Sequence, residues 1–296
     1  MLVAGTLLAT AGTLPSSARA VVQPPPGELA RSTAPDTARE APRSTAQETV
    51  GDVAEPLGGV APVTILASDI APFDVTYDVG NNLVTAGTAK LSFRRDGDAW
   101  VYTLSTRPTG VFKLTGKGRI RETSVIDVVR SGDTVQLQPK TYTYRQDEER
   151  RRRVDAAFDW DARQLSWARR EEAATETFEE PVLDRLSVTL AVMHALREGF
   201  EEIELAVFDK DEIKTMRFVN EGNETLETTM GRVETIRVRT ENVAGSSRST
   251  KTWFAPSLDY VPVRIEQHKR GELVARLSLT RLKNRITDLE LDVAEE

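Results

Sequence analysis

The sequence contains no cysteine and only two histidines, and each shortage excludes a class of chemistry. Without cysteine there are no disulfides, no thiolate metal ligands and no thiol nucleophile. Two histidines fall short of the three or four ligands of a typical zinc site. No serine stands in the G-x-S-x-G motif of a nucleophile elbow. We therefore expect no catalytic residues, no metal site and no cofactor, and interpret the protein as not an enzyme.

The chain also lacks a basic excess and a long apolar run. Its formal charge is −7 over 296 residues, and residues 73–285 carry 35 Lys and Arg against 34 Asp and Glu. Nucleic-acid binding depends on phosphate neutralisation by clustered cations, so this near-neutral balance argues against a nucleic-acid partner. After the first 20 residues no segment approaches the 18 apolar residues of a membrane-spanning helix, and we expect no transmembrane span.

The first 72 residues contain no aromatic residue, and we therefore predict that they lie outside the folded domain. Residues 1–20 combine an apolar run with the A-x-A pattern Ala18-Arg19-Ala20, typical of a signal peptide cleaved near Ala20, although a short buried helix would also fit. Residues 21–71 are rich in Pro and Ala and predict a disordered tether or, as the alternative, a Pro-rich partner motif. Residues 286–296 form an acidic tail. The signal peptide predicts that the protein is exported.

Residues 72–285 alternate apolar and polar side chains with a period of two, which is typical of antiparallel strands. One segment, 183–196, has apolar residues at helical spacing, between Pro181 and Gly199. The sequence therefore predicts a mainly β fold: a curved antiparallel sheet, as an open barrel or half-barrel, with one main helix. The expected strands are 73–79, 89–93, 100–104, 112–129, 134–145, 154–159, 164–169, 202–208, 213–221, 224–229, 233–241, 249–254, 263–268 and 273–283.

Two groups of side chains are candidates for binding. Trp253, Phe254 and Tyr260 cluster around one strand–turn–strand unit and could form either the core of a sheet corner or the rim of an apolar ligand groove. The second group could bind an anionic headgroup or a polyanion, or could be a solvated hairpin loop whose acids offset its charge; it consists of Arg150, Arg151, Arg152 and Arg153.

The segment TWFAPSLDYVPVRIE at 252–266 resembles a signature of an uncharacterised bacterial periplasmic family, the domain of unknown function 3108. The segments FDVTYDVG, VDAAFDWDARQ and LDRLSVTLAVMHALREG are similar to that family too, in the expected order, over about residues 72–283. The resemblance implies a periplasmic protein whose fold is similar to the open β-barrel of Lol-type lipoprotein carriers. Those carriers hold acyl chains between a curved sheet and its covering helices. The resemblance supplies no catalytic residues.

Three functions remain open from the sequence. The first is a non-catalytic periplasmic binding module that holds a lipid, a lipoprotein or another amphiphile in a half-barrel. An apolar cavity of several hundred Å³ would support it, whereas a well-filled interior would count against it. The second is a structural or protein-interaction component of the cell envelope, with an exposed edge or apolar patch. An enzyme is the weakest of the three.

Overall fold

The computed structural model describes residues 64–66, 71–81, 83–110, 118–131, 134–147 and 152–284. The expected signal peptide, most of the expected tether and the acidic tail lie outside these residues. The described chain contains one α-helix, α1 (Ser187–Arg197), one short 3-10 helix, η3 (Pro256–Leu258), and the following strands: β1 (Thr64–Leu66), β2 (Phe73–Gly80), β3 (Thr85–Asp96), β4 (Ala99–Pro108), β5 (Ile120–Ser131), β6 (Thr134–Gln146), β7 (Arg153–Asp159), β8 (Gln164–Arg169), β9 (Glu172–Thr177), β10 (Val182–Asp184), β11 (Glu202–Asp209), β12 (Glu212–Thr228), β13 (Gly231–Asn242), β14 (Arg248–Ala255), β15 (Val261–Lys269) and β16 (Glu272–Asn284).

All these strands belong to a single open sheet in the order β10-β11-β12-β13-β14-β15-β16-β2-β3-β4-β5-β6-β7-β8-β9, and β1 pairs with β6 off this path. Two meanders, β2 to β9 and β10 to β16, are joined by the antiparallel pair β16–β2. The other neighbours are antiparallel as well, except that β10 and β11 are parallel and linked through α1. The expected open, curved antiparallel sheet is confirmed.

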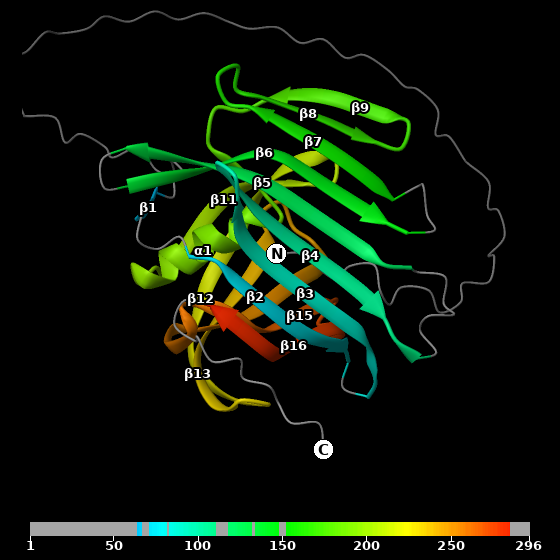
Figure 1. Cartoon of the computed structure of the whole chain (residues 1–296), viewed down its shortest axis with the longest axis vertical. Coiled ribbons are helices and arrows are strands. Elements are labelled where there is room, and N and C mark those ends of the chain that lie inside the picture. The colour runs from blue at the N-terminus through cyan, green and yellow to red at the C-terminus, as the bar shows by residue number, and fades with distance from the viewer. Residues whose placement is uncertain are drawn as a thin grey trace, which may run out of the picture. The chain divides into compact units, whose positions relative to one another are not determined.

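The helix α1 lies inside the curved sheet. It lies between the front strands β2 to β6 and the strands behind them (Figure 1). Every residue from Ser187 to Leu196 is buried, so the helix is covered on all sides. A helix of this kind needs neighbours all around it, which the curved sheet supplies. The helix therefore occupies part of the space inside the half-barrel.

The core joins strands that are far apart in the sequence. The fully buried Tyr77 of β2 donates a hydrogen bond from its hydroxyl to the carbonyl oxygen of Pro262 in β15, at 2.8 Å and across 185 residues. Around it, Phe73 packs edge-on against Tyr102, with 5.8 Å between ring centroids. The core thus ties the first meander to the second.

We expect Tyr77→Phe to lower the free energy of unfolding by about 1–3 kcal/mol, because it leaves the buried Pro262 carbonyl without its donor. Urea unfolding followed by tryptophan fluorescence measures this change. Thr280→Val is the matched control, since the Thr280 hydroxyl bonds the Thr76 carbonyl from a less buried position. Equal losses in the two variants would contradict a special role for the Tyr77 bond.

The structure corrects the element boundaries in three places. The helix begins at Ser187 rather than at 183, because Val182–Asp184 forms β10 and the Asp184 carboxylate accepts the backbone N–H groups of Leu186 and Ser187 at 2.8 and 2.9 Å. The expected strands 213–221 and 224–229 are one strand, β12, with a bulge between Asn220 and Asn223. The strand β9 was not predicted, since its sequence EAATET has no large apolar residue.

A small part of the expected tether, residues 21–71, lies among the described residues. Thr64–Leu66 forms β1 and pairs antiparallel with β6. The sequence TIL at this point is β-branched and apolar, which suits a strand even within a polar stretch.

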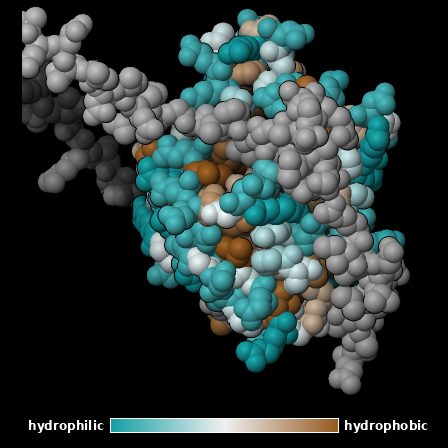
Figure 2. Space-filling model, turned by 90° about the vertical axis from the view of Figure 1, so that its left-hand side faces the viewer, coloured by the Kyte–Doolittle hydropathy of each residue, from teal (hydrophilic) through white to brown (hydrophobic). Residues whose placement is uncertain are grey.

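The surface shows few large hydrophobic residues. On the face seen in Figure 2, hydrophobic residues form scattered spots among hydrophilic ones. Among the described residues, the exposed large hydrophobic side chains are those of Leu83, Val84, Val129 and Val243. The described part of the chain also contains no helix with the length and apolar character needed to cross a membrane.

Candidate functional site

The two ends of the open sheet approach each other without pairing, and we call this region the seam. The ring of Phe208 in β11 packs edge-on against Tyr142 in β6 and Phe158 in β7, with 6.2 and 6.3 Å between centroids. An ion pair between Arg169 of β8 and Asp211 of the β11–β12 turn also crosses the seam. Side chains from β6 to β8 therefore face side chains from β10 to β12.

A pocket of about 270 Å³ opens in the seam, and its lining is strongly basic. We call it the cationic pocket. The tyrosines Tyr142 and Tyr144 and the buried Val154 form its uncharged walls. Among the described residues that line it, none carries a carboxylate, and its six cationic side chains are Arg152, Arg153, Arg169, Arg170, Arg185 and Lys210.

Most of these cations lie in or next to three connections between strands. Arg152 and Arg153 lie where β7 begins, after the β6–β7 connection. Arg170 and Lys210 each open a two-residue hairpin turn, and both have left-handed backbones with φ of 58° and 70°. A positive φ at the first of the two turn residues occurs in tight two-residue hairpins, so local turn geometry places these cations at the ends of their strands.

Arg185 enters the pocket from the buried side. Its guanidinium lies 3.5 Å from Glu122 and 3.3 Å from Asp209, and the Tyr142 hydroxyl donates to Glu122 at 2.7 Å. Burial alone would lower the pKa of Arg185, but Glu122, Tyr142 and Asp209 raise it above the ordinary value. The base of the pocket is thus a permanent positive charge held in place by buried acids.

Asp209 joins Arg185 to two lysines behind the pocket. Its carboxylate lies 3.1 Å from the Lys214 ammonium and 3.7 Å from that of Lys210. Burial would raise the pKa of Asp209, but the charges of Arg185, Lys210 and Lys214 together bring it down to about 2. Asp209 therefore stays ionised at neutral pH.

Four carboxylates lie behind the lining and hold the cations in position. Besides Glu122 and Asp209, Asp155 accepts from Arg153 at 2.8 Å and Asp211 pairs with Arg169. The lining itself carries six cations and no carboxylate among its described residues, and two of the carboxylates behind it, Asp155 and Asp209, also pair with cations outside the lining. Arginines whose carboxylate partners lie behind them keep further N–H donors for an anion, since a guanidinium carries five.

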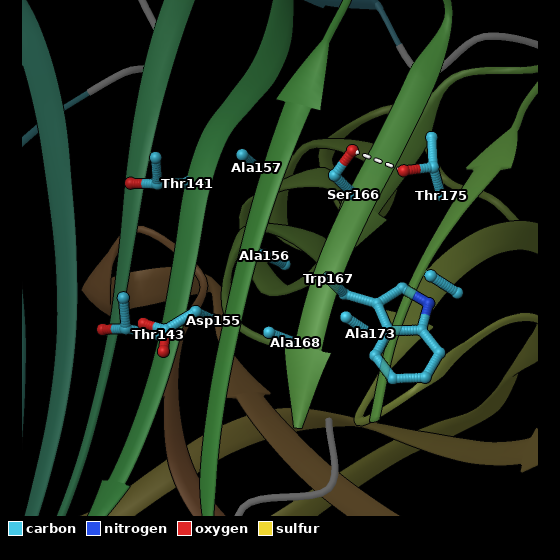
Figure 3. Close-up of a pocket in the computed structure, with 11 residues that line it drawn as sticks. Thr141, Thr143, Asp155, Ala156, Ala157, Ser166, Trp167, Ala168, Ala173 and Thr175 are labelled. Carbon is cyan, nitrogen blue, oxygen red and sulfur yellow. Dashed lines mark hydrogen bonds between the residues drawn. The ribbon is translucent and has the colours of Figure 1, made fainter. Parts of the chain in front are cut away.

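A larger hollow, of about 620 Å³, lies on strands β6 to β9 (Figure 3). It is wide open and lined mostly by alanine, serine and threonine, with Trp167 at one side and a hydrogen bond of 2.9 Å between the Ser166 and Thr175 hydroxyls. Its one ionisable lining group is Asp155. Despite its size, this hollow offers no converging charged groups, and the cationic pocket is the better candidate.

The aromatic candidates pack into the sheet corner. Trp253 and Phe254 are buried, and the Trp253 indole N–H donates to Glu224 at 2.9 Å. Tyr260 is half-buried, with the Arg197 guanidinium 5.1 Å from its ring centroid. The pockets described above are lined by other residues. A role of the three aromatics in ligand binding stays a prediction.

The run of four arginines at 150–153 indicates part of the cationic pocket. Arg150 and Arg151 lie outside the described residues, whereas Arg152 and Arg153 line the cationic pocket. Sequence reasoning favoured a solvated hairpin loop for this run, with an anion site as the alternative. It missed the four other cations, Arg169, Arg170, Arg185 and Lys210, whose only shared signal is a position at or next to the end of a strand.

Within the described ranges, no group of three or more His, Asp or Glu side chains is arranged to hold a metal ion. The fold and the pocket define an open, mainly antiparallel β half-barrel with a basic pocket at its seam.

The chain belongs to the family described as "Protein of unknown function (DUF3108)", whose family model matches residues 72–277. Curated proteins show no match. A solved structure from Brucella abortus, the beta-barrel-like protein of domain of unknown function DUF1849, is similar with a TM-score of 0.50 and 11% identity, over 73% of this chain and 99% of that one. At this identity the likeness shows the fold alone. The similarity to Lol-type carriers stays a prediction.

Proposed function

We propose that the protein is a non-catalytic binding protein of the periplasm that takes a phosphate-class anionic group in the cationic pocket. One observation carries the proposal: six cationic side chains converge on one cavity whose described lining has no carboxylate. Arginine suits this task because its planar fork donates two parallel hydrogen bonds to a phosphate or carboxylate. The anionic group could belong to a lipid headgroup or to a soluble molecule.

The size and charge of the pocket bear on the kind of ligand. Because its lining is cationic and its volume is small, a lipid would bind there by its headgroup, with its chains outside the pocket. The cavity of about 270 Å³ is close to the lower end of small-molecule sites, which suits a headgroup-sized ligand.

Binding of two probes to the full-length chain tests the proposal and separates the two sources. Inorganic phosphate represents a soluble anion, and monomeric dihexanoyl phosphatidic acid represents a lipid headgroup; dihexanoyl phosphatidylcholine is the zwitterionic comparison. We expect calorimetry to show binding of the anionic probes and weaker binding of the zwitterionic one. Lys210→Glu should weaken anion binding at least tenfold, about 1.4 kcal/mol, because it reverses a charge in the lining.

Arg94→Glu is the matched control, because Arg94 is exposed on β3 and the substitution has the same effect on net charge. It should leave the affinity unchanged. Equal weakening by the two variants would mean that only overall charge matters and would overturn the assignment of the site. If neither anionic probe binds to the unmodified chain, the interaction-protein hypothesis takes precedence.

A further inference from the structure

A second, smaller hollow adjoins the cationic pocket on the far side of Lys210. Its volume is about 80 Å³, far below the roughly 300 Å³ of the smallest usual ligand sites, so it suits one chemical group rather than a whole molecule. We call it the small pocket. It lies between the β11–β12 turn, β13 and the start of β14, and its polar lining includes Lys210, Lys214, Arg248, Thr240, Ser246 and Thr250.

The small pocket is basic despite one carboxylate in its wall. Three cations, Lys210, Lys214 and Arg248, face Asp209, which leaves an excess of two positive charges in its lining. Asp209 already lies within 4 Å of three cations, two of which, Arg185 and Lys210, line the cationic pocket. A second carboxylate, Glu212, lies 2.9 Å from Lys214 at the rim, with a side chain that is 60% exposed.

Lys210 lines both pockets and stands between them. Burial lowers the pKa of Lys210, Asp209 raises it, and the nearby charges of Arg185, Lys214 and Arg248 lower it further. Arg185 lines the cationic pocket, and Lys214 and Arg248 line the small pocket, so Lys210 has positive charge on either side. An anion in either pocket would relieve this repulsion.

We propose that the natural ligand carries two phosphate-class groups, one bound in the cationic pocket and the other in the small pocket, with Lys210 contacting both. This inference rests on the proposed function and specifies its ligand. Two linked anionic groups bind far more tightly than two separate ones, because the second binding event becomes intramolecular. The hydroxyls of Thr240, Ser246 and Thr250 supply neutral donors for the second group.

Calorimetry of the full-length chain with inorganic phosphate, pyrophosphate and tripolyphosphate, at one ionic strength, tests this inference. We expect two phosphates per chain but a single tripolyphosphate, bound at least tenfold more tightly than phosphate. Arg248 lines the small pocket and not the cationic pocket, so Arg248→Gln should reduce the stoichiometry to one phosphate. It should also abolish the extra affinity for tripolyphosphate while the remaining phosphate binds as before.

Arg94→Gln, which removes one exposed charge on β3, should change neither the stoichiometry nor the ratio of affinities. A single phosphate per unmodified chain, with no effect of Arg248→Gln, would overturn the two-group ligand and leave the proposed function standing. Absence of binding by all three probes would overturn the proposed function itself.

Discussion

Arg185→Met is expected to lower the free energy of unfolding by about 3–5 kcal/mol, the usual cost of removing one partner from a buried ion pair. The substitution leaves the fully buried Glu122 without its cationic partner. It also removes the most deeply buried of the three cations that surround Asp209. Methionine has a similar volume, so the loss reports charge rather than a cavity. Urea unfolding monitored by tryptophan fluorescence and circular dichroism measures the change.

The same variant should change the response to acid. In the folded protein the pKa of Asp209 is lowered to about 2, below its ordinary 3.8, so ionised Asp209 stabilises the fold above about pH 3.8. This contribution is lost as the pH falls toward 2. Without Arg185 the pKa of Asp209 should rise, and acid unfolding should move to a higher pH.

Two variants serve as controls for Arg185→Met. Adding Glu122→Gln should recover part of the lost stability, since it removes the stranded charge. Arg232→Met should cost less than about 1 kcal/mol, because Arg232 pairs with Glu227 at the surface, where both side chains are more than 70% exposed. A loss for Arg185→Met no larger than that for Arg232→Met would show that the buried ion cluster adds nothing to the stability of the fold.

Phe208→Ala should also cost about 3–5 kcal/mol, the range for truncating a buried phenylalanine. Phe208 is fully buried, and its edge contacts with Tyr142 and Phe158 hold the two ends of the sheet together at the seam. Because the cationic pocket lies in that seam, we expect weaker phosphate binding as well as a lower unfolding midpoint in urea.

Phe218→Ala is the matched control for the seam. Phe218 is also almost fully buried, in the neighbouring strand β12, but among the described side chains no ring contact joins it to β6 or β7. It should lose comparable stability and keep its affinity for phosphate under conditions where it is folded. If the two variants bind phosphate equally well, Phe208 does not shape the pocket.

The fold could be predicted from the sequence because most of its information is local. Alternation such as that of Phe73, Val75 and Tyr77 identifies a strand with one buried face, and the buried pattern of β2 confirms it. Prediction failed where tertiary contacts override local pattern. Asp184 belongs to a leucine-rich helical stretch, yet it pairs in β10 and uses its carboxylate to start the helix one turn later.

The site could be predicted only in part, because the curvature of the sheet brings its residues together from distant parts of the sequence. Arg153 and Lys210 are separated by more than fifty residues and lie on different meanders. They lie close together because the sheet curves until its two ends face each other. An alternating pattern of apolar and polar residues predicts a strand but does not predict how the sheet curves. The arginine run was visible because its members are adjacent in sequence; single cations in separate turns, such as Lys210, were not.

The pairing of β16 with β2 has a consequence for how the chain folds. The Thr280 hydroxyl bonds the Thr76 carbonyl across 204 residues, so β2 lacks one of its two neighbours until the last strand is available. Until then β2 presents an open edge that could pair with other chains. Folding that depends on such distant contacts is slow, since loop closure must precede the contacts that stabilise it. A chain that crosses a membrane before folding would complete this closure only after its C-terminal strand had emerged.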